Sequence, residues 1–249
     1  MTGTIVILTG AGISAESGLS TFRDNDGLWC NHRIEDVATP EAFERNPKLV
    51  HEFYNMRRAQ LKEVEPNAAH HAIGELAECW EGRLFVITQN VDDLHDRAGQ
   101  GRTLKPGYKL LHMHGELKQA RCADSEEVMA WEGEMTADMP CPCCKRTGRL
   151  RPHIVWFGEM PLYMDMITHV LQACDLFISI GTSGNVYPAA DFVRQARLNG
   201  KAHTVELNKE PSAGHSGFHE RIYGDATRIV PAYLRRVMTG EIRGSAGGV

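Results

Sequence analysis

The sequence lacks the features of several broad protein classes. Within its 249 residues, no run of Lys or Arg is long enough to suggest a nucleic-acid surface, and the formal net charge is −5. No apolar stretch approaches the roughly 18 residues needed to span a bilayer. The first apolar run begins near residue 4, so we expect no signal or transit peptide, no membrane partner and a cytoplasmic location.

A disulfide framework is also missing. The chain has seven cysteines, an odd number, and four of them lie between residues 122 and 144. This pattern favours a metal site or reduced thiols over a set of disulfides. No H-E-x-x-H pattern occurs, so we expect any zinc here to be structural.

Short apolar runs recur along the chain and predict buried strands of a parallel sheet. They lie at residues 5–8, 84–88, 176–180 and 202–207. Helical patterns occupy residues 187–200, with Pro188 near the first turn and Gly200 at the end, and residues 229–238. The alternation predicts an α/β fold with a Rossmann-like parallel sheet and helices on both faces.

Two segments interrupt this alternation. Residues 30–82 have mainly helical patterns, including Thr39 as an N-cap before Pro40, whereas residues 117–152 contain cysteine, proline and glycine without long apolar periodicity. We expect them to form a smaller lobe with a helical and a cysteine-rich part, and a cleft beside the sheet. In this division the chain is one domain, 1–249, with a large lobe of residues 1–29, 83–116 and 153–240 and a flexible tail of residues 241–249.

A glycine-rich turn follows the first predicted strand. It reads Gly10-Ala-Gly-Ile-Ser-Ala-Glu-Ser-Gly18, with Phe22 and Arg23 shortly after it. A strand, a glycine turn and a helix N-terminus can bind phosphate through backbone N–H groups. The third glycine comes six residues after Gly12, which is not G-x-G-x-x-G spacing, and no Gly-Lys-Ser/Thr follows. The turn therefore predicts a dinucleotide site that differs from that of a standard dehydrogenase.

Polar residues follow the strand predicted at 84–88. Gln89, Asn90 and Asp92 lie where parallel sheets bind ligands, although a polar loop that caps a helix at Asp92 is an alternative. Further along, His114 precedes a glycine near the junction of the lobes. It is a candidate general base, and the alternatives are a structural histidine or a metal ligand.

The cysteine cluster contains one C-x-x-C pair. Cys141 and Cys144 supply it, whereas Cys122 stands alone because Ser125 occupies the place of a second cysteine. The thiolates of these three cysteines could bind tetrahedral zinc with Cys143, a nearby histidine or water as the fourth ligand. A metal-free thiol cluster is the alternative.

Tyr54 and Arg57 are three residues apart on a predicted helix and so share a face. A phenol and a guanidinium that converge from one face can bind a carboxylate. The alternative interpretation is a solvated pair on the helix surface.

Two further stretches follow apolar runs. Val155, Phe157, Gly158 and Glu159 belong to a strand end that could offer a backbone edge to an extended peptide, or could be an aromatic core strand. Residues near the ends of the last two predicted strands could contact a second phosphate or ribose. These are Gly181, Thr182, Ser183 and Asn208.

Together these motifs resemble the sirtuins, the NAD-dependent protein lysine deacylases. The resemblance spans about residues 5–235 and is carried, in order, by the turn at 10–18 with Phe22-Arg23, Gln89-Asn-Val-Asp92, His114-Gly115, Val155-Trp-Phe-Gly-Glu159 and Gly181-Thr-Ser183. With Tyr54 and Arg57, the chain is most similar to the bacterial and mitochondrial branch that accepts acidic acyl groups such as succinyl.

The resemblance implies that NAD and an acyl-lysine protein or peptide enter the cleft. Nicotinamide and 2′-O-acyl-ADP-ribose would leave it, and one structural zinc would sit in the cysteine-rich part. Asn90 would hold the ribose and a water, Asp92 the nicotinamide carboxamide, and His114 would draw a proton through the ribose hydroxyls. The other implied NAD contacts are Gly10, Ala11, Gly12, Ala15, Glu16, Thr21, Phe22, Arg23, Trp29, Gln89, Gly181, Thr182, Ser183, Asn208 and Ala226.

Two other functions stay open from the sequence. A mono-ADP-ribosyltransferase would share nicotinamide release but pass ADP-ribose to a protein side chain. A non-catalytic sensor of NAD or ADP-ribose would bind without reaction, although the presence of Asn90, Asp92 and His114 argues against it.

Overall fold

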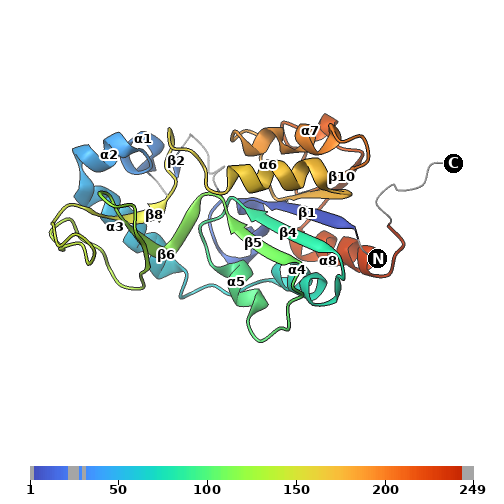
Figure 1. Ribbon diagram of the computed structural model, residues 1–249, viewed down its shortest axis with the longest axis horizontal. Helices are drawn as coiled ribbons and strands as arrows, with labels where there is room; N and C mark the ends of the chain where they lie inside the picture. Colours follow the sequence, from blue (N-terminus) through green and yellow to red (C-terminus); the bar gives the residue numbers. More distant parts are fainter. Residues whose placement is uncertain (1–2, 22–27, 30–31, 243–249) are drawn as a thin grey trace.

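A six-stranded sheet forms the centre of the molecule (Figure 1). The computed structural model describes residues 3–21, 28–29 and 32–242. The strand order is β11-β10-β9-β1-β4-β5, and all neighbouring pairs are parallel. The strands are β1 (Thr4–Thr9), β4 (Arg83–Thr88), β5 (Tyr108–His112), β9 (Leu176–Ile180), β10 (His203–Asn208) and β11 (Glu220–Tyr223). Because the chain proceeds from β1 to β4 on one side and from β9 to β10 on the other, ligands are expected at the carboxyl ends of β1 and β9.

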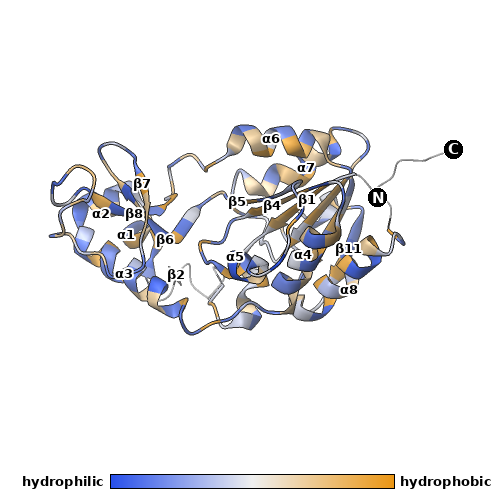
Figure 2. Ribbon diagram, turned by 60° about the horizontal axis from the view of Figure 1, so that its bottom comes forward, coloured by the Kyte–Doolittle hydropathy of each residue, from blue (hydrophilic) through white to orange (hydrophobic). Residues whose placement is uncertain are grey.

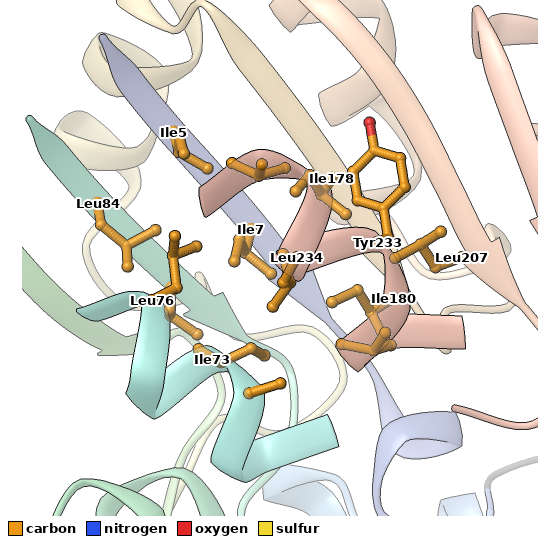
Figure 3. Close-up of a cluster of buried hydrophobic side chains, with 14 of the residues drawn as sticks. Ile5, Ile7, Ile73, Leu76, Leu84, Ile178, Ile180, Leu207, Tyr233 and Leu234 are labelled. Carbon is orange, nitrogen blue, oxygen red and sulfur yellow. The ribbon is translucent and has the colours of Figure 1, made fainter. Parts of the chain in front are cut away.

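Helices cover both faces of this sheet (Figure 1). On one face, α4 (Ala68–Cys79) and α8 (Ala226–Met238) pack against strand residues such as Ile7, as Figure 3 shows. On the other face, α6 (Met164–Ala173) and α7 (Phe192–Arg197) pack against residues such as Phe177. Strands buried on both faces need continuous apolar sequence, which is why these runs were visible. The expected Rossmann-like sheet is confirmed.

Two predicted helices have different bounds in the structure. The segment 187–200 forms a short 3-10 helix, η3 (Ala189–Asp191), followed by α7, and it ends before Gly200, whose φ is +74°. The last helix starts at Ala226, three residues before the predicted 229–238. A further helix, α5 (Leu94–Gly99), follows the polar segment after β4.

A smaller lobe lies at one end of the sheet, at the left of Figure 1. Its helices are α1 (Ile34–Val37), α2 (Pro40–Arg45) and α3 (Pro47–Gln60). Its strands are β6 (Gly115–Cys122), β7 (Val128–Ala130) and β8 (Leu150–Ile154), in the antiparallel order β7-β6-β8, and a separate antiparallel pair is β2 (Leu28–Trp29) with β3 (His32–Arg33). Thr39 caps α2 as expected, since its Oγ1 accepts a hydrogen bond from the Ala42 N–H at 3.0 Å.

The helical and the strand-containing parts of this lobe share one core. Phe53 and Tyr54 of α3 pack in the same cluster as Leu117 of β6 and Ile154 of β8. In Figure 2, α3 is orange along part of its surface and blue along the rest, as expected for a helix with one buried face. Segments that are far apart in the sequence therefore form a continuous wall.

Helix α4 lies on the sheet and not in the smaller lobe. Its Ile73 and Leu76 belong to the cluster that contains β1, β4 and α8 (Figure 3). The assignment of residues 30–82 as one helical insertion was therefore too long, because apolar periodicity identifies a buried face but not its partner. Among the helices described, none is long and apolar enough to cross a membrane.

Candidate active site

A cleft with a cavity volume of about 490 Å³ runs along the carboxyl ends of β1, β4, β9 and β10 and reaches the smaller lobe. Every cofactor and acyl-lysine residue expected from the sequence lines it, within the part of the chain that the structure describes. Phe22, Arg23 and the side chain of Trp29 lie outside the described residues. The cleft thus brings together motifs that are separated by more than 200 residues.

The glycine turn is held against the turn that follows β9. The Gly12 N–H donates to the Gly181 carbonyl oxygen at 2.9 Å, and a Cβ at Gly12 would lie 2.7 Å from the Gly181 Cα. Gly181 itself has a φ of +62°. A glycine turn can bind phosphate, but backbone packing between the two turns by itself already requires glycine at position 12. The segment forms two 3-10 helices, η1 (Ala11–Ile13) and η2 (Ala15–Ser17), and not the regular helix expected after the turn.

Ser14 links the two candidate catalytic residues that follow β4. Its Oγ accepts a hydrogen bond from Asn90 Nδ2 at 3.0 Å and donates to Asp92 Oδ2 at 3.0 Å. Asp92 Oδ1 also accepts from the Leu94 N–H at 3.2 Å, so Asp92 both faces the cleft and organises the start of α5. Burial raises the pKa of Asp92, while its hydrogen bonds oppose this shift. Ser14 is a site residue that the sequence motifs did not predict, and its hydroxyl group inside the glycine turn is the signal that could have indicated it.

A buried histidine, His70, contacts the hydroxyl group of Ser14. The Asn67 N–H donates to His70 Nδ1 at 3.3 Å, so the ring carries its proton on Nε2, which lies 3.4 Å from Ser14 Oγ. Burial lowers the pKa of His70 to about 3, and the ring is therefore neutral near pH 7. This tautomer lets His70 donate toward Ser14, whose own proton points to Asp92.

His114 lies in the wall of the cleft directly after β5. Its Nδ1 lies 3.1 Å from the Gln89 carbonyl oxygen, and burial lowers its pKa while this hydrogen bond opposes the shift. The following Gly115 has a φ of +82°, and a Cβ there would lie 2.0 Å from the His153 carbonyl oxygen. The close approach of β8 therefore fixes the backbone that presents the imidazole.

The end of the cleft that is formed by β10 and the start of α8 is polar. Asn208 Nδ2 donates to the Thr182 carbonyl oxygen at 2.8 Å, and the Glu16 carboxylate accepts from the Thr227 N–H at 2.9 Å and from its hydroxyl at 2.6 Å. Ala226, beside Thr227, also lines the cleft. These bonds join the first turn, the β9 turn and the start of α8 around one end of the cavity.

Tyr54 and Arg57 line the same cleft from α3. Only 1% of Tyr54 and 6% of Arg57 is exposed, so the interpretation as a solvated surface pair is wrong. The Tyr54 hydroxyl oxygen accepts a hydrogen bond from Trp156 Nε1 at 3.0 Å, and Arg57 Nη1 donates to Gln60 Oε1 at 3.2 Å. Burial raises the pKa of Tyr54, so the phenol stays neutral.

The segment after β8 completes the wall between the lobes. The Val155 N–H donates to the His114 carbonyl oxygen at 2.9 Å, and the Phe157 N–H donates to the Ala38 carbonyl oxygen at 3.0 Å. Phe157 is 44% exposed and Gly158 has a φ of +91°, so the chain turns outward here. The interpretation as an aromatic core strand holds for Trp156, which is buried, whereas contact of this segment with a peptide stays a prediction.

Comparison with known proteins decides the family. Residues 10–188 match the model of the Sir2 family. The chain belongs to the Sir2 family. The motif-based resemblance to the sirtuins is thereby confirmed, and the match includes both glycine turns and the segment around His114.

Several relatives of this Sir2 protein are named NAD-dependent protein deacylase. The proteins from Yersinia pestis and Escherichia coli K12 are 55% and 52% identical over 243 residues, which is 96% and 97% of this chain and 84% of each relative. The protein from Pasteurella multocida is 57% identical over 236 residues, 94% of this chain and 97% of the relative.

Solved Sir2 structures have the same fold. A Sir2 homologue in complex with NAD superposes with a TM-score of 0.82 at 34% identity, covering 95% of this chain and 90% of the homologue. A Sir2 mutant with a p53 peptide and NAD gives a TM-score of 0.74 at 26% identity, covering 96% and 93%.

The cysteine-rich part of this Sir2 protein has a geometry that fits zinc. The Sγ atoms of Cys122, Cys141 and Cys144 all lie within 4.8 Å of one another, as three corners of a tetrahedral thiolate site require. The Cys143 Sγ lies outside this trio and 3.0 Å from Ser125 Oγ. The cluster could therefore hold one zinc ion with Cys144, not Cys143, as the third thiolate. That ion would connect Cys122, at the end of β6, to the loop that contains Cys141 and Cys144.

Proposed function

We propose that this protein, an NAD-dependent protein deacylase of the Sir2 family, removes acetyl and also succinyl or malonyl groups from lysine side chains. One observation carries the finer part of the proposal. Tyr54 and Arg57 are buried in the wall of the cleft that also contains Asn90, Asp92 and His114. Acyl-lysine proteins or peptides are the partners that this arrangement favours. The free thiols of the cysteine cluster favour a reducing compartment, and we propose the cytoplasm.

The reaction needs positioning more than strong acid or base. NAD supplies an electrophilic ribose carbon and nicotinamide as the leaving group. Asn90 and Asp92, held in register by Ser14, would orient the ribose and the carboxamide. His114, with its proton on Nδ1, would accept a proton at Nε2. These roles explain why Asn90, Asp92 and His114 converge on one region of the cleft.

The acidic-acyl claim follows from the cost of burying charge. A carboxylate at the end of an acyl chain loses hydration when it enters the cleft, and this loss needs a charged or hydrogen-bonding partner. The guanidinium of Arg57 supplies charge, and the phenol of Tyr54 supplies a neutral O–H group. An acetyl group carries no such charge and gains nothing from either side chain.

The test uses matched acetyl-lysine and succinyl-lysine peptides with and without NAD, analysed by mass spectrometry. We expect Arg57→Met to lower kcat/KM for the succinyl peptide by about 10- to 100-fold, since a charge-assisted hydrogen bond is lost. The acetyl peptide should change by less than about 3-fold, because a neutral acyl group gains no charge-assisted bond. Arg45→Met is the matched control, because Arg45 bonds Glu35 and Asp36 on the surface of the helical part. Equal losses on both peptides would contradict the acidic-acyl role.

The same experiment separates the other functions. A deacylase yields free lysine and acyl-ADP-ribose only when NAD is present. A mono-ADP-ribosyltransferase would leave the ADP-ribose mass on protein, and a sensor would release no nicotinamide.

A further inference from the structure

Trp156 contacts the candidate acyl-binding residue Tyr54 through the only polar atom of its side chain. The indole Nε1 donates to the Tyr54 hydroxyl oxygen at 3.0 Å, across 102 residues of sequence. Trp156 is 2% exposed and also lines the cleft. A buried indole N–H needs a partner, and here the partner is the phenol that faces the acyl group.

The indole ring is fixed by a guanidinium on its face. The Arg151 Cζ lies 3.5 Å from the Trp156 ring centroid, a close stacking contact. Arg151 is in turn held by Glu159 through two bonds, Nη1 to Oε1 at 2.8 Å and Nη2 to Oε2 at 3.0 Å. Its Nη2 also donates to the Ile154 carbonyl oxygen at 3.0 Å.

Glu159 also contacts the backbone of Trp156. Glu159 Oε2 accepts a hydrogen bond from the Trp156 N–H at 2.8 Å. Trp156 is therefore held at its main chain by Glu159 and at its ring by Arg151, which Glu159 also holds. The indole has one orientation, and its N–H points at one atom.

The consequence concerns the direction of the Tyr54 proton. An indole N–H can only donate, so it occupies a lone pair of the phenol oxygen. What the Tyr54 hydroxyl can offer to a ligand is then its own O–H, in a direction set by the indole. A phenol O–H favours the plane of its ring, so without this contact the Tyr54 proton could take either of two in-plane directions, and binding a carboxylate would cost more entropy.

We propose that Trp156, held by Arg151 and Glu159, is a positioning residue that sets acyl selectivity by directing the Tyr54 hydroxyl toward the carboxylate of an acidic acyl chain. The inference rests on the proposed acidic-acyl activity and adds to it a residue that acts through the Tyr54 hydroxyl group. It assigns Glu159 a role inside the protein, and the peptide contact expected from the sequence stays a separate prediction for the same residue, which lines the cleft.

Trp156→Phe tests the proposal directly, because phenylalanine keeps an aromatic ring under Arg151 but has no N–H. We expect KM for the succinyl peptide to rise by about 5- to 10-fold, the value of one neutral hydrogen bond, with kcat changed by less than about 2-fold. The parameters for the acetyl peptide and KM for NAD should stay within about 2-fold, since neither substrate contacts the Tyr54 hydroxyl. Trp80→Phe is the matched control, since it removes an indole N–H bond of 3.0 Å to the Gly3 carbonyl oxygen.

Two further variants keep the test decisive if Trp156→Phe folds poorly. Arg151→Lys removes the planar stack and the paired bonds to Glu159, and should shift succinyl KM in the same direction. In the Tyr54→Phe background, Trp156→Phe should add almost nothing, because both changes act through one hydroxyl group.

The possible outcomes separate this inference from the proposed function. Equal changes on both peptides, or additive effects of the two Phe substitutions, would show that Trp156 acts only in packing. If Arg57→Met changes acyl selectivity and Trp156→Phe does not, the inference fails and the proposed function stands. If Arg57→Met has no selective effect, the proposed function fails and the inference fails with it.

Discussion

The Nδ1 atom of His114 lies 3.1 Å from the carbonyl oxygen of Gln89. A carbonyl oxygen can only accept, so Nδ1 carries the proton and Nε2 keeps its lone pair. The Gln89 N–H in turn donates to the Thr9 carbonyl oxygen at 2.9 Å, which anchors Gln89 to the end of β1. The central strands thereby fix the tautomer of the candidate base.

The first prediction concerns pH. Burial lowers the pKa of His114 below its ordinary 6.5, and the hydrogen bond to Gln89 only partly opposes this. The neutral ring is the form that accepts a proton, so kcat/KM should fall on the acid side with a midpoint below pH 6.5. A pH profile of deacetylation measures it, and a midpoint above 6.5 would contradict the assignment. His114→Tyr should abolish this activity while the thermal unfolding curve stays cooperative.

The second prediction concerns the paired turns. Gly12→Ala places a Cβ 2.7 Å from the Gly181 Cα and 2.8 Å from its carbonyl oxygen, both backbone atoms that cannot move alone. We expect a loss of about 2 kcal/mol in the free energy of unfolding, as for other overpacked sites, and much weaker NAD binding by calorimetry. Gly133→Ala is the control, since a Cβ there meets nothing within 4 Å. Wild-type NAD affinity in Gly12→Ala would refute the packing constraint.

The third prediction concerns an ion pair behind the site. His112 Nε2 lies 3.0 Å from Asp96 Oδ2. Burial lowers the pKa of His112, but the hydrogen bond and charge of Asp96 outweigh it, and the pKa is raised above the ordinary 6.5. The pair therefore stabilises the fold fully below pH 6.5, and this contribution is lost as the pH rises through the raised pKa of the folded state.

Asp96→Asn should reveal that dependence. We expect the free energy of unfolding to fall by about 1 kcal/mol at pH 6, where the imidazolium is paired, and by less at pH 9. Denaturant titrations at the two pH values provide the measurement. Asp165→Asn, on the exposed side of α6, is the control. A loss that is larger at pH 9 would show that the pair does not act through the charge on His112.

The fourth prediction concerns the cysteine cluster. We expect purified protein to contain about one zinc per chain, and Cys141→Ser to abolish binding by leaving two of the three converging thiolates. Cys143→Ser should retain the metal, since its Sγ lies outside the trio. Cys79→Ser, on the exposed side of α4, controls for general thiol loss. Elemental analysis measures the zinc content of each variant. Loss of zinc in Cys143→Ser would show that Cys143, and not Cys144, is the third ligand.

The sequence predicted four of the six strands of the sheet, those that are almost fully buried, but not β5 or β11, whose partly exposed residues break the apolar run. The run at 176–180 matches β9 at both ends, since apolar residues there have no solvent-facing alternative. The placement of α4 could not be predicted in the same way. Its apolar stripe indicates one buried face, and either the sheet or the smaller lobe could have covered it.

Site residues could be predicted where the motif is a short continuous stretch of sequence. They could not be predicted where a role depends on a contact with a residue far away along the chain. The turn at Gly10 and the segment at Asn90 each follow a strand, which places them at one edge of the sheet. Ser14 and Trp156 were missed because their partners lie far along the chain. Ser14 meets a residue 78 positions away, and Trp156 meets one 102 positions away.

The contact between Glu16 and Thr227 has a consequence for synthesis of the chain. The two residues are 211 positions apart, yet one carboxylate receives both bonds from the start of the last helix. A growing chain that contains every motif up to β10 still has one end of the cleft open. Completion of this end of the cleft therefore has to wait until α8 has left the ribosome and can dock against the first turn.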